Sequence, residues 1–330
     1  MIQFVIRRLI AMLLTMFAIS FVAFAIIQLP PGDYLTTYIA SLAATGEQVD
    51  PRVIETLRQQ YGLGDPYLVQ YFKWISGIVV GNFGTSFEWK RPVGDLIWGR
   101  LGNSILLEGL AVIVMWLIAL PIGVYAAVRK YSLGDYLATV VGFVGLAVPN
   151  FFFALILMYL SFVWFGETIG GLYSQSFESA PWSLAKLWDF LSHAWVPVLV
   201  LATAGTAELI RILRANLLDE LKKPYVTTAR AKGLAEWRVI LKYPVRLALN
   251  PLVSTIGWLL PALISGSVIV SVVMNLPTAG PMLLRSLTTQ DMYLAGAIIL
   301  LLSVLTVIGT LISDILLAWI DPRIRYGGGE

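Results

Sequence analysis

Three carboxylates in or beside long apolar runs are the first residues whose type and position suggest chemistry. They are Glu108, Glu208 and Asp314. A charge at the centre of a bilayer costs about 3 kcal/mol or more, so such a carboxylate is a candidate for carrying a proton or coupling ion, or for lining a polar path. Glu208 lies three residues before Arg211, however, and Asp314 lies near the end of its run. Ion pairing or solvent exposure is the simpler explanation of these two residues.

Several other kinds of site are excluded by what the sequence lacks. It contains no cysteine, so it forms neither disulfides nor thiolate metal sites. Its single histidine, His193, cannot build a metal cluster by itself, and we expect no metal site. The pattern G-x-x-x-x-G-K-[ST] is absent, so this chain has no P-loop for a nucleotide. No group of nucleophile, acid and base stands out, and no catalytic residue is predicted.

The densest group of charges lies in residues 227–246, TTARAKGLAEWRVILKYPVR, between two apolar stretches. Pro224 suits the first turn of a helix, which predicts a short helix over 225–232 that Gly233 interrupts. The residues that follow predict a second short helix with an apolar and a basic face. The apolar face holds Trp237, Ile240 and Leu241, and the basic face holds Arg238 and Lys242.

These residues belong to a chain that is far more apolar than a soluble domain. Of its 330 residues, 58% are hydrophobic and 13% are charged, and the mean hydropathy is +0.79. About 20 consecutive apolar residues cross a bilayer core. Runs near that length are 9–29, 105–128, 136–165, 195–210, 252–273 and 293–320. The first is too long for the apolar core of a secretory signal, and we interpret it as an uncleaved anchor. The sequence predicts an all-α, polytopic integral membrane protein with six transmembrane helices.

The distribution of basic residues predicts the orientation of these six helices. Of the 23 Lys and Arg residues, 15 fall on the side that holds both ends of the chain, nine of them between Arg211 and Arg246. Cytoplasmic loops carry the excess of basic residues, so both termini and the segment 227–246 are expected to be cytoplasmic. This topology explains the pI of 9.0, and no nucleic-acid partner is predicted. Physical chemistry alone supports two interpretations of this segment equally: a basic helix that lies on anionic lipid, and a docking element for a cytoplasmic partner.

The apolar runs also divide the chain into three segments. Residues 1–29 are expected to form the N-terminal cytoplasmic end and the first transmembrane helix, and residues 30–104 an extracytoplasmic insertion. Residues 105–330 then form a core domain of five transmembrane helices, with a cytoplasmic loop at about 218–250. The large polar insertion is a candidate docking surface for a partner outside the membrane.

The fifth apolar run combines small residues with a proline. Ser254, Gly257 and Ser265 would let helices pack closely, and Pro261 permits a bend. Packing is the simpler role for each residue taken singly. Together they predict a central helix, and the four residues are candidates for lining a translocation path.

The segment YVTTARAKGLAEWRVILKYPVRLALNP, residues 225–251, closely resembles the cytoplasmic coupling loop of bacterial ABC importer permeases of the oligopeptide/dipeptide type. That family typically reads Y-V-x-T-A-R-A-K-G-L, followed by a basic segment and N-A-x-x-P. The matching residues are Tyr225, Val226, Thr228, Ala229, Arg230, Ala231, Lys232, Gly233, Leu234, Arg246, Ala248 and Pro251. Further matches are Pro31-Gly32-Asp33, Tyr61-Gly62-Leu63, Val148-Pro149-Asn150-Phe151 and Asp321-Pro322-Arg323. The resemblance therefore extends from the first apolar run to the last residues.

Three departures limit what the resemblance implies. Thr227-Thr228-Ala229 stands where the broader importer motif begins with E-A-A, and Tyr243-Pro244 stands where relatives commonly have His-Ala. Residues 272–280 lack the acid and the phenylalanine of the family's E-x-x-F-x-x-P-G-L-G. The last departure weakens inferences about substrate and outer gate, and leaves the docking helix intact.

The resemblance implies a transmembrane permease subunit of an ATP-driven ABC importer in the bacterial cytoplasmic (inner) membrane. Its solute, a peptide or a related small molecule, would be delivered by an extracytoplasmic solute-binding protein. The other implied partners are two cytoplasmic ATPase subunits and a second homologous permease subunit. ATP and Mg would be used by the ATPase subunits, with no cofactor bound by this chain and no enzymatic activity of its own.

The resemblance also implies which residues couple to the ATPase. They are Thr228, Ala229, Arg230, Ala231, Lys232, Gly233, Leu234 and Trp237. We expect Ala229 and Gly233 to permit close approach to the ATPase, and Trp237 to anchor the loop to the membrane domain. The alternative function is an ion-coupled secondary transporter that uses the intramembrane carboxylates, which would leave the loop unexplained. The solute stays open among peptides, opines and oligosaccharides.

Overall fold

The computed structural model describes residues 2–28, 34–44, 51–61, 64–166, 169–178, 180–255 and 268–320. In these ranges the regular structure is α-helical, with one isolated antiparallel bridge between Thr85 and Pro92. The helical content confirms the predicted all-α class. The chain divides into two compact units: unit 1 comprises residues 1–103 and 278–307, and unit 2 comprises residues 104–277 and 308–330. The division falls within two long helices, and each unit is described by itself.

Unit 1 joins the N-terminal part of the chain to a segment near its C-terminal end. Its helices are α1 (Ile2–Gln28), α2 (Tyr34–Ala44), α3 (Pro51–Tyr61), α4 (Tyr67–Val79), the start of α5 (Val93–Val128), α15 (Ala279–Thr288) and the start of α16 (Met292–Ile320). Helix α4 packs on α1 through Tyr71 and Trp74, which are almost fully buried beside Phe24. Inside this apolar contact, the hydroxyl groups of Ser20 and Tyr71 share a hydrogen bond of 2.8 Å.

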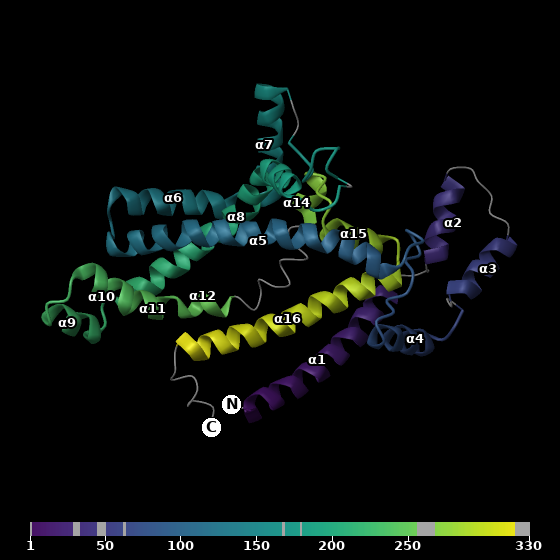
Figure 1. Cartoon of the computed structure of the whole chain (residues 1–330), viewed down its shortest axis with the longest axis horizontal. Helices are drawn as coiled ribbons and strands as arrows, with labels where there is room; N and C mark the ends of the chain where they lie inside the picture. Colours follow the sequence, from purple (N-terminus) through teal and green to yellow (C-terminus); the bar gives the residue numbers. More distant parts are fainter. Residues whose placement is uncertain are drawn as a thin grey trace. The chain divides into compact units, whose positions relative to one another are not determined.

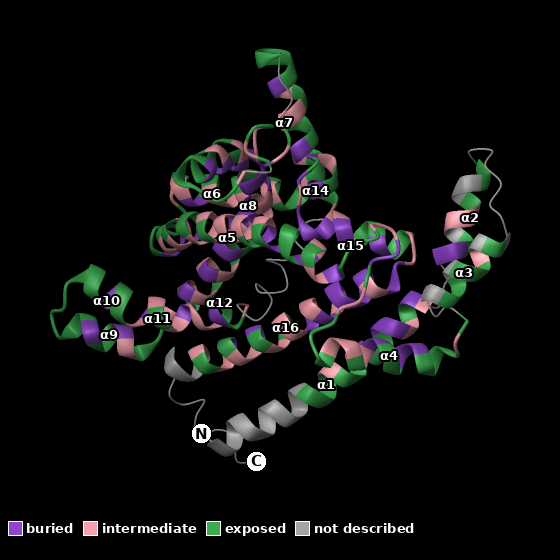
Figure 2. Cartoon of the chain, turned by 45° about the vertical axis from the view of Figure 1, so that its right-hand side comes forward, coloured by how far each residue is buried: buried purple, intermediate pink, exposed green. Residues whose placement is uncertain are grey.

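Unit 2 is organised around α8 (Leu184–Glu220). The remaining helices of unit 2 are the second part of α5, α6 (Leu133–Ala147), α7 (Asn150–Phe165), α9 (Pro224–Ala231), α10 (Glu236–Lys242), α11 (Pro244–Ala248), α12 (Asn250–Ser254), α14 (Val268–Val273) and the end of α16. Helices α6, α7, α11 and α12 all pack on α8. Within unit 2, α9 and α10 lie at one end, and α7 and α14 lie toward the other (Figures 1 and 2).

Three of the predicted transmembrane runs fall in helices that are long and apolar enough to cross a membrane. In the described residues, α5, α8 and the segment Met292–Leu316 of α16 are long and apolar enough to cross a membrane. The first run lies largely in α1, and Leu13–Gln28 is a shorter apolar helical stretch within it. The fifth run begins in α12 and ends in α14, and its central residues 256–267 lie outside the described part of the chain.

The third predicted run, residues 136–165, is not one straight helix. Helices α6 and α7 meet at an angle of 97°. Pro149 lacks an N–H group and disfavours helical geometry in the residue before it. Val148 is accordingly extended, with φ −89° and ψ 118°. The Val148-Pro149 pair thus interrupts an apolar stretch that hydropathy alone reads as continuous.

Candidate functional site

The loop between α8 and α11 is built from two short helices and a sharp turn. Helix α9 begins with Pro224 in its first turn and ends at Ala231, and α10 follows from Glu236. Gly233 connects them with φ +73°, a left-handed backbone conformation that side chains with a Cβ rarely adopt. This geometry confirms the broken helical element predicted from the sequence.

An apolar cluster holds α9 against α10. Val226, Ala229 and Val239 are buried, with Tyr225 and Tyr243 packed against them. The exposed fraction of Ala229 is only 7%. Its small side chain therefore serves the packing of the two helices, and the two helices of the loop form one packed element.

The other side of α9 and the turn is open to solvent. Its exposed residues, here called the exposed face of α9, are Thr228, Arg230, Ala231, Lys232, Gly233 and Leu234. A Cβ atom added at Gly233 would meet no other atom within 4 Å. Thr228 donates its hydroxyl hydrogen to the backbone oxygen of Pro224 at 3.0 Å.

An ion pair braces the turn. The Arg230 Nη2 group lies 2.6 Å from Glu236 Oε1, and its Nε–H also contacts the same carboxylate. The hydrogen bond from Arg230 lowers the pKa of the Glu236 carboxyl below its ordinary value. Because this pair joins the end of α9 to the start of α10, Arg230 contributes to the shape of the turn as well as to its charge.

The base of the loop is tied to the end of α8. Tyr225 donates its hydroxyl hydrogen to Glu220 Oε2 at 2.5 Å. Burial, together with this hydrogen bond, raises the pKa of Tyr225 above its ordinary value. On the outgoing side, Ala248 and Leu252 are buried with Leu213 and Leu217 of α8. A displacement of α9 and α10 would therefore be transmitted to α8 at both ends of the loop.

One side of α10 lines an apolar groove against the end of α5. The groove has a volume of about 680 Å³. Its walls are formed by Leu120, Pro121, Val124, Tyr125, Val128 and Arg129 from α5, and by Trp237, Ile240, Leu241, Val245 and Leu249. Ile240 is buried, whereas Trp237 is 61% and Leu241 55% exposed. Trp237 thus lines the groove but is only partly covered within this chain, and its predicted role as an anchor to the membrane domain stays a prediction.

This loop lies in the part of the chain that matches a known family. Residues 119–326 match the family described as "Binding-protein-dependent transport system inner membrane component", and residues 1–108 match the corresponding N-terminal family. The chain belongs to this family. It is a permease subunit of a binding-protein-dependent ABC importer and a multi-pass protein of the bacterial inner membrane, as the motifs of residues 225–251 predicted.

The similar proteins span the whole length of this permease. The oligopeptide transport system permease protein AppB of Bacillus subtilis (strain 168) is 38% identical over 99% of this chain and 100% of its own length. The glutathione transport system permease protein GsiC of Escherichia coli (strain K12) is 33% identical, over 99% of this chain and 100% of its own. A putative peptide permease protein of Brucella ovis is 32% identical over 98% of this chain and 99% of its own length.

A buried ion pair of the permease was not predicted from the sequence. Asp135, in the first turn of α6, is 2% exposed and accepts two hydrogen bonds from Arg214 of α8, from Nε at 2.7 Å and from Nη2 at 2.8 Å. It also accepts one from the backbone N–H of Tyr131 at 2.9 Å. The local signal was present, because Ser132 caps α6 and Ser132-x-x-Asp135 is a helix-start pattern. The pairing fixes α6 to the segment of α8 that leads to the loop.

The three carboxylates predicted in apolar runs come from three helices of unit 2. Glu108 lies in α5 and Asp314 in α16, both half-buried, whereas Glu208 of α8 is exposed within this chain. The described residues contain no group of three or more His, Cys, Asp or Glu side chains that could hold a metal ion.

Only one of the four predicted path residues lies in the described part of the permease. Gly257, Pro261 and Ser265 fall outside it. Ser254 ends α12 and is exposed, with its Oγ–H donated to the backbone oxygen of Pro251 at 2.6 Å. Its own backbone oxygen accepts a hydrogen bond from Ser313 of α16 at 3.4 Å.

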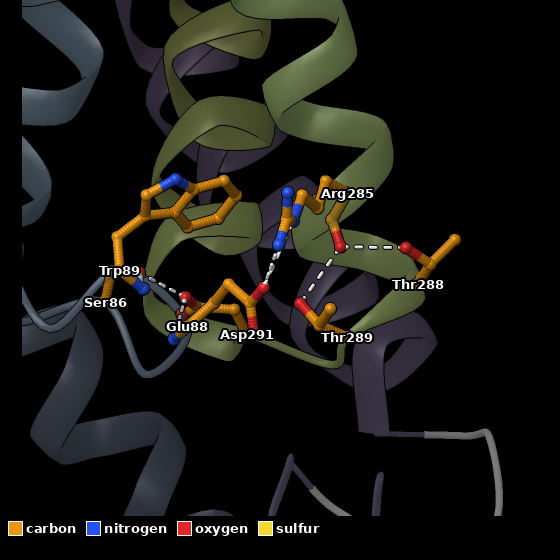
Figure 3. Close-up of polar contacts among 7 residues, drawn as sticks. All are labelled: Ser86, Glu88, Trp89, Arg285, Thr288, Thr289 and Asp291. Carbon is orange, nitrogen blue, oxygen red and sulfur yellow. Dashed lines mark hydrogen bonds and ion pairs between the residues drawn. The ribbon is translucent and has the colours of Figure 1, made fainter. Parts of the chain in front are cut away.

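A second polar cluster of the permease lies in unit 1, in the turn before α5 and at the junction of α15 and α16 (Figure 3). Asp291 is fully buried and accepts hydrogen bonds from the Ser86 hydroxyl at 2.5 Å and from the Glu88 backbone at 3.2 Å. Burial raises the pKa of Asp291, although these hydrogen bonds oppose the shift. Arg285 pairs with Glu88 at 2.5 Å, and its guanidinium lies 5.3 Å from the centre of the Trp89 ring. The cluster fixes the turn of residues 84–92 to the α15–α16 junction.

Proposed function

We propose that residues 218–250 are the coupling loop through which this permease engages its ATPase. The observation that carries this proposal is the geometry of the loop: a packed pair of helices, tied to α8 at both ends, exposes a face of small and basic residues. The residues that we assign to the contact are Thr228, Arg230, Ala231, Lys232, Gly233 and Leu234. Ala229 and Trp237 lie behind this face: Ala229 holds α9 on α10, and Trp237 lines the groove between α10 and the end of α5.

The mechanism that follows is alternating access driven by the partner subunits. When the two ATPase subunits close on ATP and Mg, they displace α9. Because α9 packs on α10, and because α11 and α12 pack on α8, the displacement moves α8 and the helices that it contacts. This chain performs no covalent step. Its contribution is to convert movement of the loop into a change of access for the solute.

The complete importer would contain two cytoplasmic ATPase subunits, a second homologous permease subunit and an extracytoplasmic solute-binding protein. The family description names dependence on a binding protein. The relatives transport oligopeptides, glutathione or peptides according to their names. We therefore propose a peptide or peptide-like molecule as the solute, ahead of opines and oligosaccharides.

Reconstitution tests this assembly. In proteoliposomes, we expect uptake of a labelled peptide only when this permease, its partner permease, the ATPase subunits, the binding protein and ATP are all present. The ATPase-free permease is expected not to bind nucleotide, since it has no P-loop. Uptake by the permease alone, driven by a proton or sodium gradient, would instead establish the ion-coupled mechanism with Glu108, Glu208 and Asp314 as its candidate residues.

The proposed topology has six transmembrane helices, with both termini and the coupling loop in the cytoplasm and residues 30–104 outside. The excess of basic residues in the inner loops supports this orientation. In the described residues, α5, α8, α16 and the bent pair α6–α7 account for up to four of the six spans. On this topology, the polar cluster of Asp291 and Arg285 belongs to the outer surface. The segment 30–104 would then offer a docking surface to the binding protein, with the turn at Glu88 held in place by Arg285.

Labelling of single introduced cysteines tests this topology. The natural chain contains no cysteine, so it contributes no background labelling. Lys90 and Lys130 are both exposed. With a membrane-impermeant maleimide on intact spheroplasts, we expect Lys90→Cys to be labelled, and Lys130→Cys and Glu330→Cys to be labelled only after permeabilisation. Labelling of Lys130→Cys or Glu330→Cys in intact cells would overturn the proposed orientation.

A further inference from the structure

We infer that the groove between α5 and α10 is a binding site for an anionic phospholipid of the cytoplasmic leaflet. The site would hold one acyl chain in the groove and the phosphate headgroup against basic residues at its rim. This inference rests on the proposed cytoplasmic position of the coupling loop. It assigns a ligand to a surface of α10 that the ATPase contact does not use.

The walls of the groove suit an acyl chain. They are almost entirely apolar, and their volume of about 680 Å³ falls in the range of about 300–1,000 Å³ typical of small-molecule sites. The surface continues beyond the groove along α5, where Leu117 is 69% and Ile113 is 56% exposed. Only 22% of the most apolar window of α5 is buried within this chain. An exposed apolar stripe of this kind on a membrane-spanning helix is what lipid tails cover.

The rim of the groove supplies positive charge. Arg129 itself lines the groove at the end of α5, and Lys130 follows it, exposed. On the α10 side, the Arg238 guanidinium lies 5.1 Å from the centre of the ring of Trp237, which lines the groove. Basic residues close to an anionic membrane surface attract its headgroups. Tryptophan beside such residues is typical of the boundary between lipid tails and water.

The charges decide between a lipid and a protein helix as the occupant. A partner helix would bury the groove but would give no reason for basic residues on both of its sides. An anionic phospholipid satisfies both the apolar walls and the basic rim. Since α10 belongs to the coupling loop, the lipid would also brace the loop against α5, and transport would depend on the lipid composition of the membrane.

The lipid can be identified by cross-linking in the intact importer. A photoreactive benzoylphenylalanine in place of Leu241, which is 55% exposed in the groove wall, should form an adduct with the mass of a phospholipid when the complex is irradiated in membranes containing phosphatidylglycerol. An adduct with a partner subunit and none with a phospholipid would overturn the inference. Cysteine labelling at Lys130 reports the sidedness of the loop independently, so failure of the topology and failure of the lipid site are distinguishable.

The headgroup preference is tested by native mass spectrometry of the complex with added phosphatidylglycerol or phosphatidylethanolamine of the same acyl chains. We expect the natural protein to retain the anionic lipid preferentially, and each basic rim residue to contribute about fivefold. The double variant Arg129→Gln, Arg238→Gln should therefore lose most of this preference. Lys223→Gln is the matched control, because it removes an exposed charge from the same loop without lining the groove.

The variant Leu241→Asp tests whether the groove holds an acyl chain. It places a charge on the apolar wall and should therefore weaken retention of both lipids. Two results would contradict the inference: an unchanged headgroup preference in the double variant, or equal retention of both lipids by the natural protein. A loss of preference in Lys223→Gln as large as in the double variant would also contradict it, since the effect would then reflect net charge and not this site.

Discussion

Gly233→Leu should leave the permease inserted in the membrane and abolish most of its transport. Gly233 has φ +73°, and an ordinary residue in the left-handed conformation costs about 1–2 kcal/mol. The added side chain would project from the exposed face of α9, where no atom of this chain lies within 4 Å of a Cβ. It would therefore collide with the partner rather than with the permease itself. A loss of about 1.4 kcal/mol in the contact lowers affinity tenfold, and we expect uptake to fall by at least that factor.

The measurement compares membrane level, co-purification of the ATPase and uptake of labelled solute. Gly166→Leu is the matched control, since Gly166 ends α7 with φ +74° and also has open space around its Cβ position. It carries the same backbone cost away from the coupling loop, and should retain ATPase association. Gly233→Asn separates the two contributions, because asparagine tolerates the left-handed conformation but still adds a side chain to the contact.

If the loop only lay on lipid, the leucine at 233 would be tolerated or would strengthen membrane contact. Normal ATPase association together with normal uptake in Gly233→Leu would therefore refute the coupling assignment. An equal loss in Gly166→Leu would show that the backbone strain, and not the partner contact, is responsible.

The broken helical shape of residues 224–242 could be predicted because its signals are local. Pro224 begins a helix, Gly233 breaks it, and the spacing of Trp237 and Ile240 gives the second helix an inner face. Each of these effects acts within a few residues. The 97° bend at Val148-Pro149 was also signalled locally, but hydropathy averages over the two residues that cause it. The run therefore looked like one straight span.

Long-range pairings could not be predicted from a single sequence. Ser86 and Asp291 are 205 residues apart, and nothing in either neighbourhood indicates the other. Ala229 illustrates a different limit. A small residue in a docking motif suggests close approach to a partner, whereas its 7% exposure follows from how α9 packs on α10.

The buried pair of Asp135 and Arg214 leads to the second large effect. Asp135→Ala should destabilise the permease by about 3 kcal/mol, the lower end of the range for breaking a buried ion pair. The lower end applies because the Arg214 side chain remains 27% exposed. The variant leaves the guanidinium without its carboxylate and the Tyr131 N–H without its acceptor. Thermal unfolding of the purified complex should show a midpoint lowered by several degrees.

The exposed pair of Asp219 and Lys222, near the end of the same helix, is the matched control. Their side chains are 76% and 73% exposed at a separation of 3.2 Å. Exposed ion pairs contribute only about 0–1 kcal/mol, so Asp219→Ala should hardly change the unfolding midpoint. A shift in Asp219→Ala as large as that in Asp135→Ala would contradict the special role of the buried pair.

A double-mutant cycle distinguishes the pair from two independent residues. Once Asp135 is absent, Arg214 stabilises nothing through that carboxylate, so Asp135→Ala, Arg214→Ala should be no less stable than either single variant. Additive losses would show that the two residues act separately.

The position of the pair predicts a functional effect as well, because it fixes α6 to the part of α8 that carries the coupling loop. If movement of the loop reaches the membrane helices through this part of α8, Asp135→Ala should lower the number of solute molecules transported per ATP hydrolysed. A purely structural role would lower the amount of intact complex and leave that ratio unchanged.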